Sequence, residues 1–259
     1  MHAISAAEAA ILAAAGLAAG FVNTAAGAGS LLSLRALMIT GLPADIANGT
    51  NRVPVLLQSL VAARGFSRHQ PIAARDLAKA AGPACAGALV GSVAATFTPE
   101  RAMRYLLIGV LLAVAVLGLV TARRGSRREG TGDEHRTELE LRPATAAWLF
   151  VSGLYGGFLQ AGVGLVLLFA LGSVARLDLV RANGLKVATV AVFSVVATAV
   201  FVLRGQVAWV HAVVMSVGAV IGARLGVAYA VRYARQLQVF VVAVDVLACA
   251  WLVWRELAA

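Results

Sequence analysis

The chain has 259 residues, of which 61% are hydrophobic and only 13% are charged. Soluble globular domains carry about 45–50% apolar and about 25% charged residues, so this composition excludes an ordinary water-soluble domain. It is typical of a chain whose outer surface faces lipid. The net charge of +10 comes from basic residues in short segments between apolar runs. No basic patch interleaved with aromatic residues appears, and we expect no nucleic-acid partner.

Six apolar runs are long enough to cross a bilayer, which takes about 20 residues; they are 4–22, 77–98, 105–122, 187–203, 207–230 and 237–254. A further helix is predicted at 52–66, with Pro54 in its first turn, where proline is tolerated. Two other apolar regions are interrupted by glycines. Gly27-Ala28-Gly29 separates the opening helix from a short segment at 30–42, and Gly162-Val163-Gly164 divides the region 145–176.

One long polar stretch, 123–142, mixes arginines with acidic residues and is predicted to be a flexible loop, with an ordered interaction motif as the alternative. It divides the chain into a first transmembrane repeat (1–122), a cytoplasmic polar linker (123–144) and a second transmembrane repeat (145–259).

The two halves are related by an internal repeat. When the chain is shifted by 135 residues, glycine and asparagine positions match without a gap. The matches are Ala26-Gly27-x-Gly29 with Ala161-Gly162-x-Gly164, Ala47-Asn48-Gly49 with Ala182-Asn183-Gly184, and Gly87-Ala88-x-x-Gly91 with Gly222-Ala223-x-x-Gly226.

Lysine and arginine placement predicts the orientation of the repeats. The basic segments 64–79, 123–142 and 232–235 belong in the cytoplasm, and the connections near Pro99 and Gln206, poor in positive charge, belong outside. Segment 64–75 is then inside while its partner 199–210 is outside. The sequence therefore predicts an all-α, polytopic integral membrane protein with two inverted-topology repeats and glycine-broken helices, an architecture common among secondary transporters.

The same residues carry a family resemblance. The run 20–30, the turn Gly41-Leu42-Pro43 and the run Ala47–Arg52 resemble the first half of the TauE/SafE family of anion exporters, and 153–164 and 181–186 resemble its second half. The resemblance covers nearly the whole chain outside the linker. It implies a protein of the cell inner membrane that exports small sulfur-containing anions such as sulfite or sulfonates.

The glycine breaks are the first candidate substrate site. A broken helix in lipid leaves backbone groups that need partners, and a helix starting after Gly29, with Ser30 near its N-cap, presents N–H donors and a positive dipole end. The helix start after Gly162 and Gly164, near Leu165, does the same in the other half. Two such ends predict an anion site. The alternative is that the glycines only permit close helix packing.

Asn48, Asn51, Arg52, Asn183 and Lys186 are the second candidate set, with Asn48 equivalent to Asn183 and Asn51 to Lys186. Asparagine donates to anion oxygens, and an intramembrane cation costs about 2.5–3.5 kcal/mol, so it usually has a function. The alternative is that the asparagines cap the following helices and the cations extend to the interface.

Other polar positions are weaker candidates. Gln160, Asn23 and Thr24 precede the breaks and could donate to a ligand. Asp76 and His211 are repeat equivalents at helix starts, where interfacial solvation accounts for them. Asp245 lies inside the run 237–254.

No nucleotide-binding, metal or nucleophile motif appears, so we expect no enzyme activity, no metal and no cofactor. The leading hypothesis is an anion exporter that works by alternating access, with homo-oligomerisation left open. An importer of inorganic sulfur anions is the alternative. A scaffold subunit would be favoured if the glycine breaks packed tightly with no cavity between them.

Overall fold

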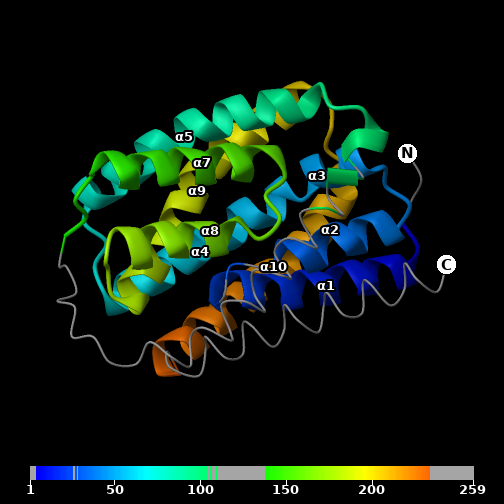
Figure 1. Cartoon of the computed structure of the whole chain (residues 1–259). Coiled ribbons are helices and arrows are strands. Elements are labelled where there is room, and N and C mark those ends of the chain that lie inside the picture. The colour runs from blue at the N-terminus through cyan, green and yellow to red at the C-terminus, as the bar shows by residue number, and fades with distance from the viewer. Residues whose placement is uncertain are drawn as a thin grey trace.

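A computed structural model describes residues 4–25, 27, 29–103, 105–106, 109 and 138–233. Its elements are helices, arranged side by side along one long direction (Figure 1). They are α1 (Ala6–Ala25), α2 (Ser30–Ile39), α3 (Ala44–Thr50), α4 (Arg52–His69), α5 (Ala74–Thr96), α7 (Pro143–Phe158), α8 (Val163–Leu168), the π-helix η1 (Phe169–Val174), α9 (Leu179–Leu203) and α10 (Trp209–Arg232). The helix predicted at 237–254, most of that at 105–122, and linker residues 123–137 lie outside the described residues.

Four of the described helices, α1, α5, α9 and α10, are long and apolar enough to cross a membrane. Their outer surfaces are apolar as well. Along α10, four side chains spaced by one helical turn, Val213, Val217, Ile221 and Leu225, are each 47–60% exposed. Such a stripe would be unfavourable in water and is stable against lipid tails. The prediction of an all-α polytopic membrane protein is confirmed.

The second half repeats the element order of the first. The helical segments beginning at Ser30, Ala44 and Ala74 have counterparts that begin within two residues of the positions 135 further along, at Val163, Leu179 and Trp209. The backbone repeats too. Gly27 and Gly162 both have positive φ (95° and 71°), as do the equivalent residues Gly41 and Arg176 (88° and 61°).

The structure differs from the prediction at the start of α9 and in the segment before α4. The helix predicted at 187–203 begins at Leu179, because the Asp178 carboxylate accepts hydrogen bonds from the N–H groups of Val180 and Arg181. The helix predicted at 52–66 is preceded by α3, and only Asn51 separates the two. Pro54 explains this interruption, because it has no N–H for the carbonyl of Thr50. The equivalent position in α9 is Thr189, and α9 is continuous.

Glycines bring two pairs of helices into close contact. A Cβ atom at Gly20 in α1 or Gly222 in α10 would overlap the backbone of the other helix, and the same holds for Gly87 in α5 and Gly153 in α7. The members of each pair run parallel, since the contacts advance in the same direction along both chains. Small residues that let backbones approach are the usual means of packing helices in lipid.

The repeat equivalents α4 and α9 lie in the middle and run antiparallel to each other. Gly49, just before α4, lies beside Phe201 near the end of α9, whereas Phe66 near the end of α4 lies beside Gly184 near the start of α9. Most of the buried polar side chains of the spans come from these two helices and from the breaks that face them.

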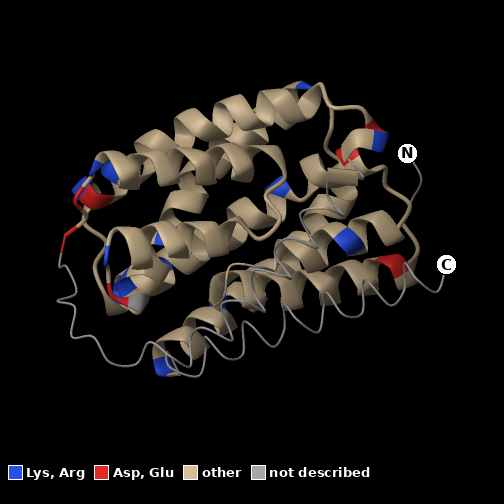
Figure 2. Ribbon diagram, in the orientation of Figure 1, with Lys and Arg blue, Asp and Glu red and all other residues tan. Residues whose placement is uncertain are grey.

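Charged residues gather at the two ends of the molecule, with mostly uncharged helix between (Figure 2). One end is formed by the C-terminus of α4, the N-terminus of α5 and the segments 138–142 and 174–178. It carries six of the fourteen lysines and arginines in the described part of the chain, namely Arg68, Arg75, Lys79, Arg142, Arg176 and Arg181. At the opposite end, Arg101 and Arg204 are accompanied by Glu8, Asp45 and Glu100.

Candidate functional site

The two glycine breaks meet inside the molecule. Gly27 and Gly162 adopt left-handed backbone conformations that reverse the chain after α1 and α7. A Cβ atom at Gly27 would lie 2.5 Å from the carbonyl carbon of Gly164, so the two backbones touch. The space expected between the breaks is therefore closed in this structure, and the packing interpretation is correct for this glycine pair. Gly29 is the N-cap of α2, Ser30 is its first residue, and the second helix begins at Val163, two residues before the predicted start.

Arg52 closes the C-terminal end of α7. Its buried guanidinium donates to the carbonyl oxygens of Gly156, Gly157 and Phe158, and to Oε1 of Gln160 at 2.6 Å. It also lies 4.8 Å from the centre of the Phe201 ring. The last carbonyls of an interrupted helix carry partial negative charge and need donors, so a cation there is favourable. Arg52 has the contacts of a helix cap.

Lys186 occupies the corresponding place at the end of α1. Its ammonium group is buried and donates to the carbonyl oxygens of Asn23 and Thr24, each at 3.3 Å. These hydrogen bonds are longer than most of those of Arg52, and no carboxylate among the described residues pairs with Lys186. The positive charge of Lys186 is thus only partly compensated.

Asn48 and Asn183 reinforce these caps. The amide of Asn48 donates to the carbonyl of Phe158 at 2.8 Å, and that of Asn183 donates to the carbonyl of Ala25 at 3.2 Å. Each half therefore uses one asparagine and one cation to close the broken helix of the other half.

The alternative in which the asparagines cap the following helices and the cations extend to the interface is wrong. Asn51 is the N-cap of α4 and Asp178 is the N-cap of α9, so neither Asn48 nor Asn183 caps the predicted helix. Lys186 and Arg52 are 1% and 0% exposed, so neither reaches the interface. At 1.5 Å per residue, Lys186 lies about 10 Å along α9 from Leu179, well inside the span.

A small cavity lies beside the contact between the breaks. Its polar lining comes from Asn23, Thr24, Gln58, Ser59 and Lys186, and Val163, Gly164, Val187 and Val190 complete the wall. It has room for about one water molecule. The side chains of Gln58 and Ser59 are 2% and 5% exposed, and neither hydrogen-bonds to another described residue.

The structure separates the predicted site residues into groups. Lys186 and Gly164 line the cavity, Asn48, Arg52 and Asn183 form the caps, and Gly27 and Gly162 shape the breaks. Asn51 accepts a hydrogen bond from Ser33 at 2.6 Å, away from the cavity lining. Gln160, a predicted ligand, is bound instead to Arg52 and Ser194. Sequence reasoning did not select Gln58 and Ser59 as ligands. The available signals were two polar residues inside an apolar helix and, for Ser59, its match to Ser194 in the repeat.

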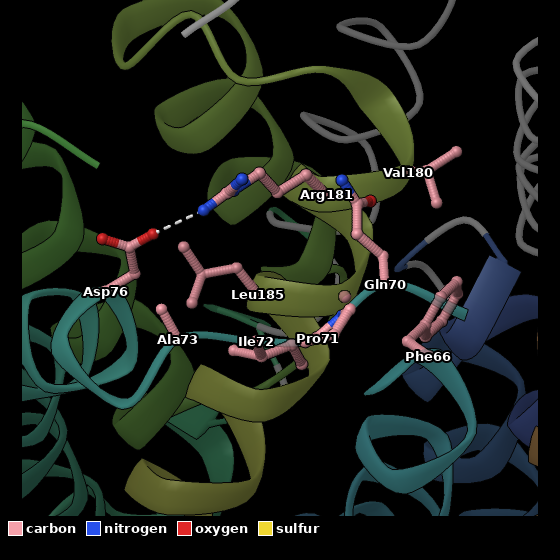
Figure 3. A pocket seen from close by; sticks show the side chains of 10 residues that line it. Phe66, Gln70, Pro71, Ile72, Ala73, Asp76, Val180, Arg181 and Leu185 are labelled. Carbon is pink, nitrogen blue, oxygen red and sulfur yellow. Dashed lines mark hydrogen bonds and ion pairs between the residues drawn. The ribbon is translucent and has the colours of Figure 1, made fainter. Parts of the chain in front are cut away.

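A second pocket lies at the basic end of the molecule, between the C-terminal part of α4, the following loop and the start of α9 (Figure 3). Arg181 forms an ion pair with Asp76 at 2.9 Å across it, and Asp76 also accepts a hydrogen bond from the N–H of Leu139. Asp76 is only 4% exposed. The expectation that solvent accounts for Asp76 is wrong, because Arg181 neutralises its charge.

The equivalent place at the opposite end is packed more tightly. A Cβ atom at Gly184 would lie 3.4 Å from Cβ of Phe66, an ordinary contact, whereas one at the equivalent Gly49 would overlap the carbonyl oxygen of Gln206. The same pair of central helices is thus looser at the basic end than at the other.

The long apolar helices, the interrupted helices and the buried polar centre define a multi-pass membrane transporter. The family model for the sulfite exporter TauE/SafE matches residues 12–252, and the chain belongs to this family. No group of three or more His, Cys, Asp or Glu side chains suited to a metal ion occurs among the described residues.

Relatives over most of the chain have transporter names. A probable membrane transporter protein of Haemophilus influenzae is 28% identical over 220 residues, covering 84% of this chain and 83% of the relative. Probable membrane transporter protein ORF9 of Sinorhizobium sp is 26% identical, covering 82% and 79%, and YfcA of Escherichia coli K12, also a probable membrane transporter protein, is 26% identical, covering 80% and 75%. No solved structure matches the chain. The chain is a transporter of the inner membrane.

Proposed function

We propose that this protein is a secondary transporter that exports small anions, most simply sulfur-containing ones such as sulfite or a sulfonate, by alternating access. The buried Lys186 ammonium is the observation on which the proposal rests. It borders a polar cavity beside two interrupted helices, and no described carboxylate neutralises it. Because burying an uncompensated charge is costly, a mobile anion is the natural partner for this cation.

The predicted inverted relation of the halves supports alternating access. The repeat equivalents α4 and α9 are antiparallel, and α1 pairs with α10 as α7 pairs with α5, which is the pattern expected when a two-fold axis exchanges the halves. The looser packing around Gly184 than around Gly49 fits a state that is sealed at the outer end and nearer to opening at the basic, cytoplasmic end.

Export also agrees with the driving force across a cytoplasmic membrane. An interior-negative potential favours anion exit by about 2.3 kcal/mol per charge per 100 mV. An importer of inorganic sulfur anions would need a coupled ion to overcome this term. The tight contact between Gly27 and Gly164 favours a scaffold subunit, but the cavity with its cationic wall lies directly beside that contact and favours transport.

Flux in proteoliposomes tests this function. Purified protein is reconstituted, and movement of radiolabelled sulfite, sulfoacetate, sulfate and thiosulfate is measured under imposed potential and pH gradients. We expect at least one anion to move faster than in protein-free vesicles, with a rate that follows the potential. Transport only against the potential and with a cation gradient would indicate an importer, and no flux of any of the four would favour the scaffold.

A further inference from the structure

We propose, on the basis of the transport function above, that Gln58 and Ser59 contact the anion directly and that the protein has one anion site. The site is the cavity beside Lys186. Its repeat equivalent beside Arg52 serves the fold and binds no substrate.

The two equivalent places differ in what fills them. On the Arg52 side, Gln160 accepts a hydrogen bond from the guanidinium and donates to Oγ of Ser194 at 3.1 Å. On the Lys186 side, Ala25 stands at the position of Gln160, and Ser59 at the position of Ser194. Alanine has no group that can reach Ser59. The polar partner present on one side is therefore missing on the other, and a cavity is left there.

The difference between the two cations, an arginine on one side and a lysine on the other, also leaves the Lys186 side with fewer hydrogen bonds. Arg52 uses its guanidinium on three carbonyls of α7, on Gln160 and, at 3.2 Å, on Asn48. Lys186 has three N–H donors and hydrogen-bonds to only two carbonyls. One ammonium donor remains for a ligand on the cavity side. On the other side, protein oxygens engage both Nη groups of Arg52, and only its Nε–H has no partner.

The cavity supplies donors from two directions. Lys186 projects from α9, and the amide of Gln58 and the hydroxyl of Ser59 project from α4, with Asn23 at the end of α1. The Gln58 amide faces the cavity and has no hydrogen bond to another described residue, so a ligand that accepts a hydrogen bond from it gains an interaction that the protein does not supply. Such an arrangement matches a small oxyanion with at least two terminal oxygens, one toward the ammonium and one toward the α4 donors. A neutral molecule would leave the ammonium uncompensated.

The present cavity is smaller than any such anion, since it holds about one water molecule. Five of its nine lining residues belong to α4 and α9, which are antiparallel repeat equivalents, and the other four belong to α1 and α8. Separation of α4 from α9 would therefore enlarge it. Binding of the anion would therefore accompany separation of the two helices at the looser end.

The test compares Gln58→Leu and Lys186→Met with Ser194→Ala. Leucine keeps the approximate volume of Gln58 and removes its donor, and Ser194 is the counterpart of Ser59 on the Arg52 side, where it is hydrogen-bonded to Gln160. Two quantities are measured for each variant, the sulfite concentration giving half-maximal flux and the rise in thermal midpoint of detergent-solubilised protein on adding sulfite.

We expect Gln58→Leu to raise the half-maximal sulfite concentration about tenfold and Lys186→Met to abolish the sulfite-induced rise, with Ser194→Ala unchanged in both. If the wild type transports sulfite and Gln58→Leu has the same half-maximal sulfite concentration and the same thermal rise, the inference is wrong and the transport function stands. A thermal rise in the wild type that is lost in Gln58→Leu, without flux, would support the site and refute transport. Absence of both responses in the wild type would overturn both proposals.

Discussion

At the scale of single residues, the two buried cations Arg52 and Lys186 differ in their contacts, although their positions in the repeat are only one residue apart. Arg52 presents a planar group with several fixed donors, which suits the carbonyls at the end of a helix. Lys186 is a compact point charge with fewer donors. A cation that made many hydrogen bonds to an anion would release it slowly. Using a lysine at the cavity and an arginine at the cap is therefore consistent with a site that must bind and release substrate.

The first residue-scale prediction concerns Arg52. Arg52→Leu leaves the carbonyls of Gly156 and Gly157 and the amide oxygen of Gln160 without this donor, in a place where water is scarce. We expect a loss of about 3 kcal/mol in stability, seen as a lower thermal midpoint and a smaller monodisperse fraction after solubilisation. Arg68→Leu, at an exposed position on the same helix, is the control and should leave both unchanged. Normal stability with weakened sulfite binding would instead assign Arg52 to the substrate.

The sequence predicted the positions of most of the buried polar residues at the centre, but it did not predict the role of each one. Glycine and asparagine positions stood out because they repeat in register, and the cations stood out because a charge inside a membrane span is costly. The structure brings these residues to the centre. Their division into caps and cavity could not be predicted, because it depends on which helix end lies opposite each side chain. Gln58 has no polar repeat partner, since Phe193 occupies the equivalent position, so the repeat gave no indication of it.

At the scale of elements, backbone contact between parallel helices joins the outer helices of one half to those of the other. The α5–α7 pair has no inter-helix ion pair among the described residues, and its glycines bring the backbones within contact distance. In lipid there is little hydrophobic gain from pairing apolar helices, so this close packing is the main source of their association.

Two glycines of α5 test this interpretation within one helix. A Cβ atom at Gly87 would overlap the carbonyl oxygen of Phe150, whereas nothing lies within 4 Å of one at Gly82. Gly87→Ala should lower the thermal midpoint, with a cost of about 1–3 kcal/mol for forcing the helices apart. Gly82→Ala should be neutral or stabilising by up to about 1 kcal/mol, because alanine favours helix. Equal midpoints for the two variants would show that α5 and α7 do not pack through these glycines.

The sequence predicted the spans at this scale better than it predicted where the helices begin. Apolar runs gave the number and order of the described spans. The starts of α3 and α9 were missed because their first turns contain Asp45, Asn48, Arg181 and Asn183, which lower the local hydropathy. These residues are tolerated inside the spans because partners from the other half satisfy several of their polar groups, a tertiary effect that a hydropathy pattern does not contain.

At the scale of the whole molecule, the distribution of charge complements the arrangement of helices. The basic end includes the pocket of Figure 3, the Asp76–Arg181 ion pair and the hydrogen bond from Lys79 to the carbonyl of Leu139. The segment before α7 is thereby fastened to the start of α5. Cytoplasmic loops of membrane proteins carry an excess of lysine and arginine, so this end is expected to face the cytoplasm.

Cysteine labelling tests this orientation with one position at each end. In a chain carrying Cys85→Ala and Cys249→Ala, Glu140→Cys places an exposed thiol at the basic end and Arg204→Cys places one at the opposite end. A membrane-impermeant maleimide added to intact spheroplasts should label Arg204→Cys, and Glu140→Cys should react only after lysis. The orientation matters for mechanism, because it determines that the looser packing beside Gly184 faces the side from which an exported anion enters. The reverse labelling pattern would put that entrance outside, and the same structure would then favour uptake.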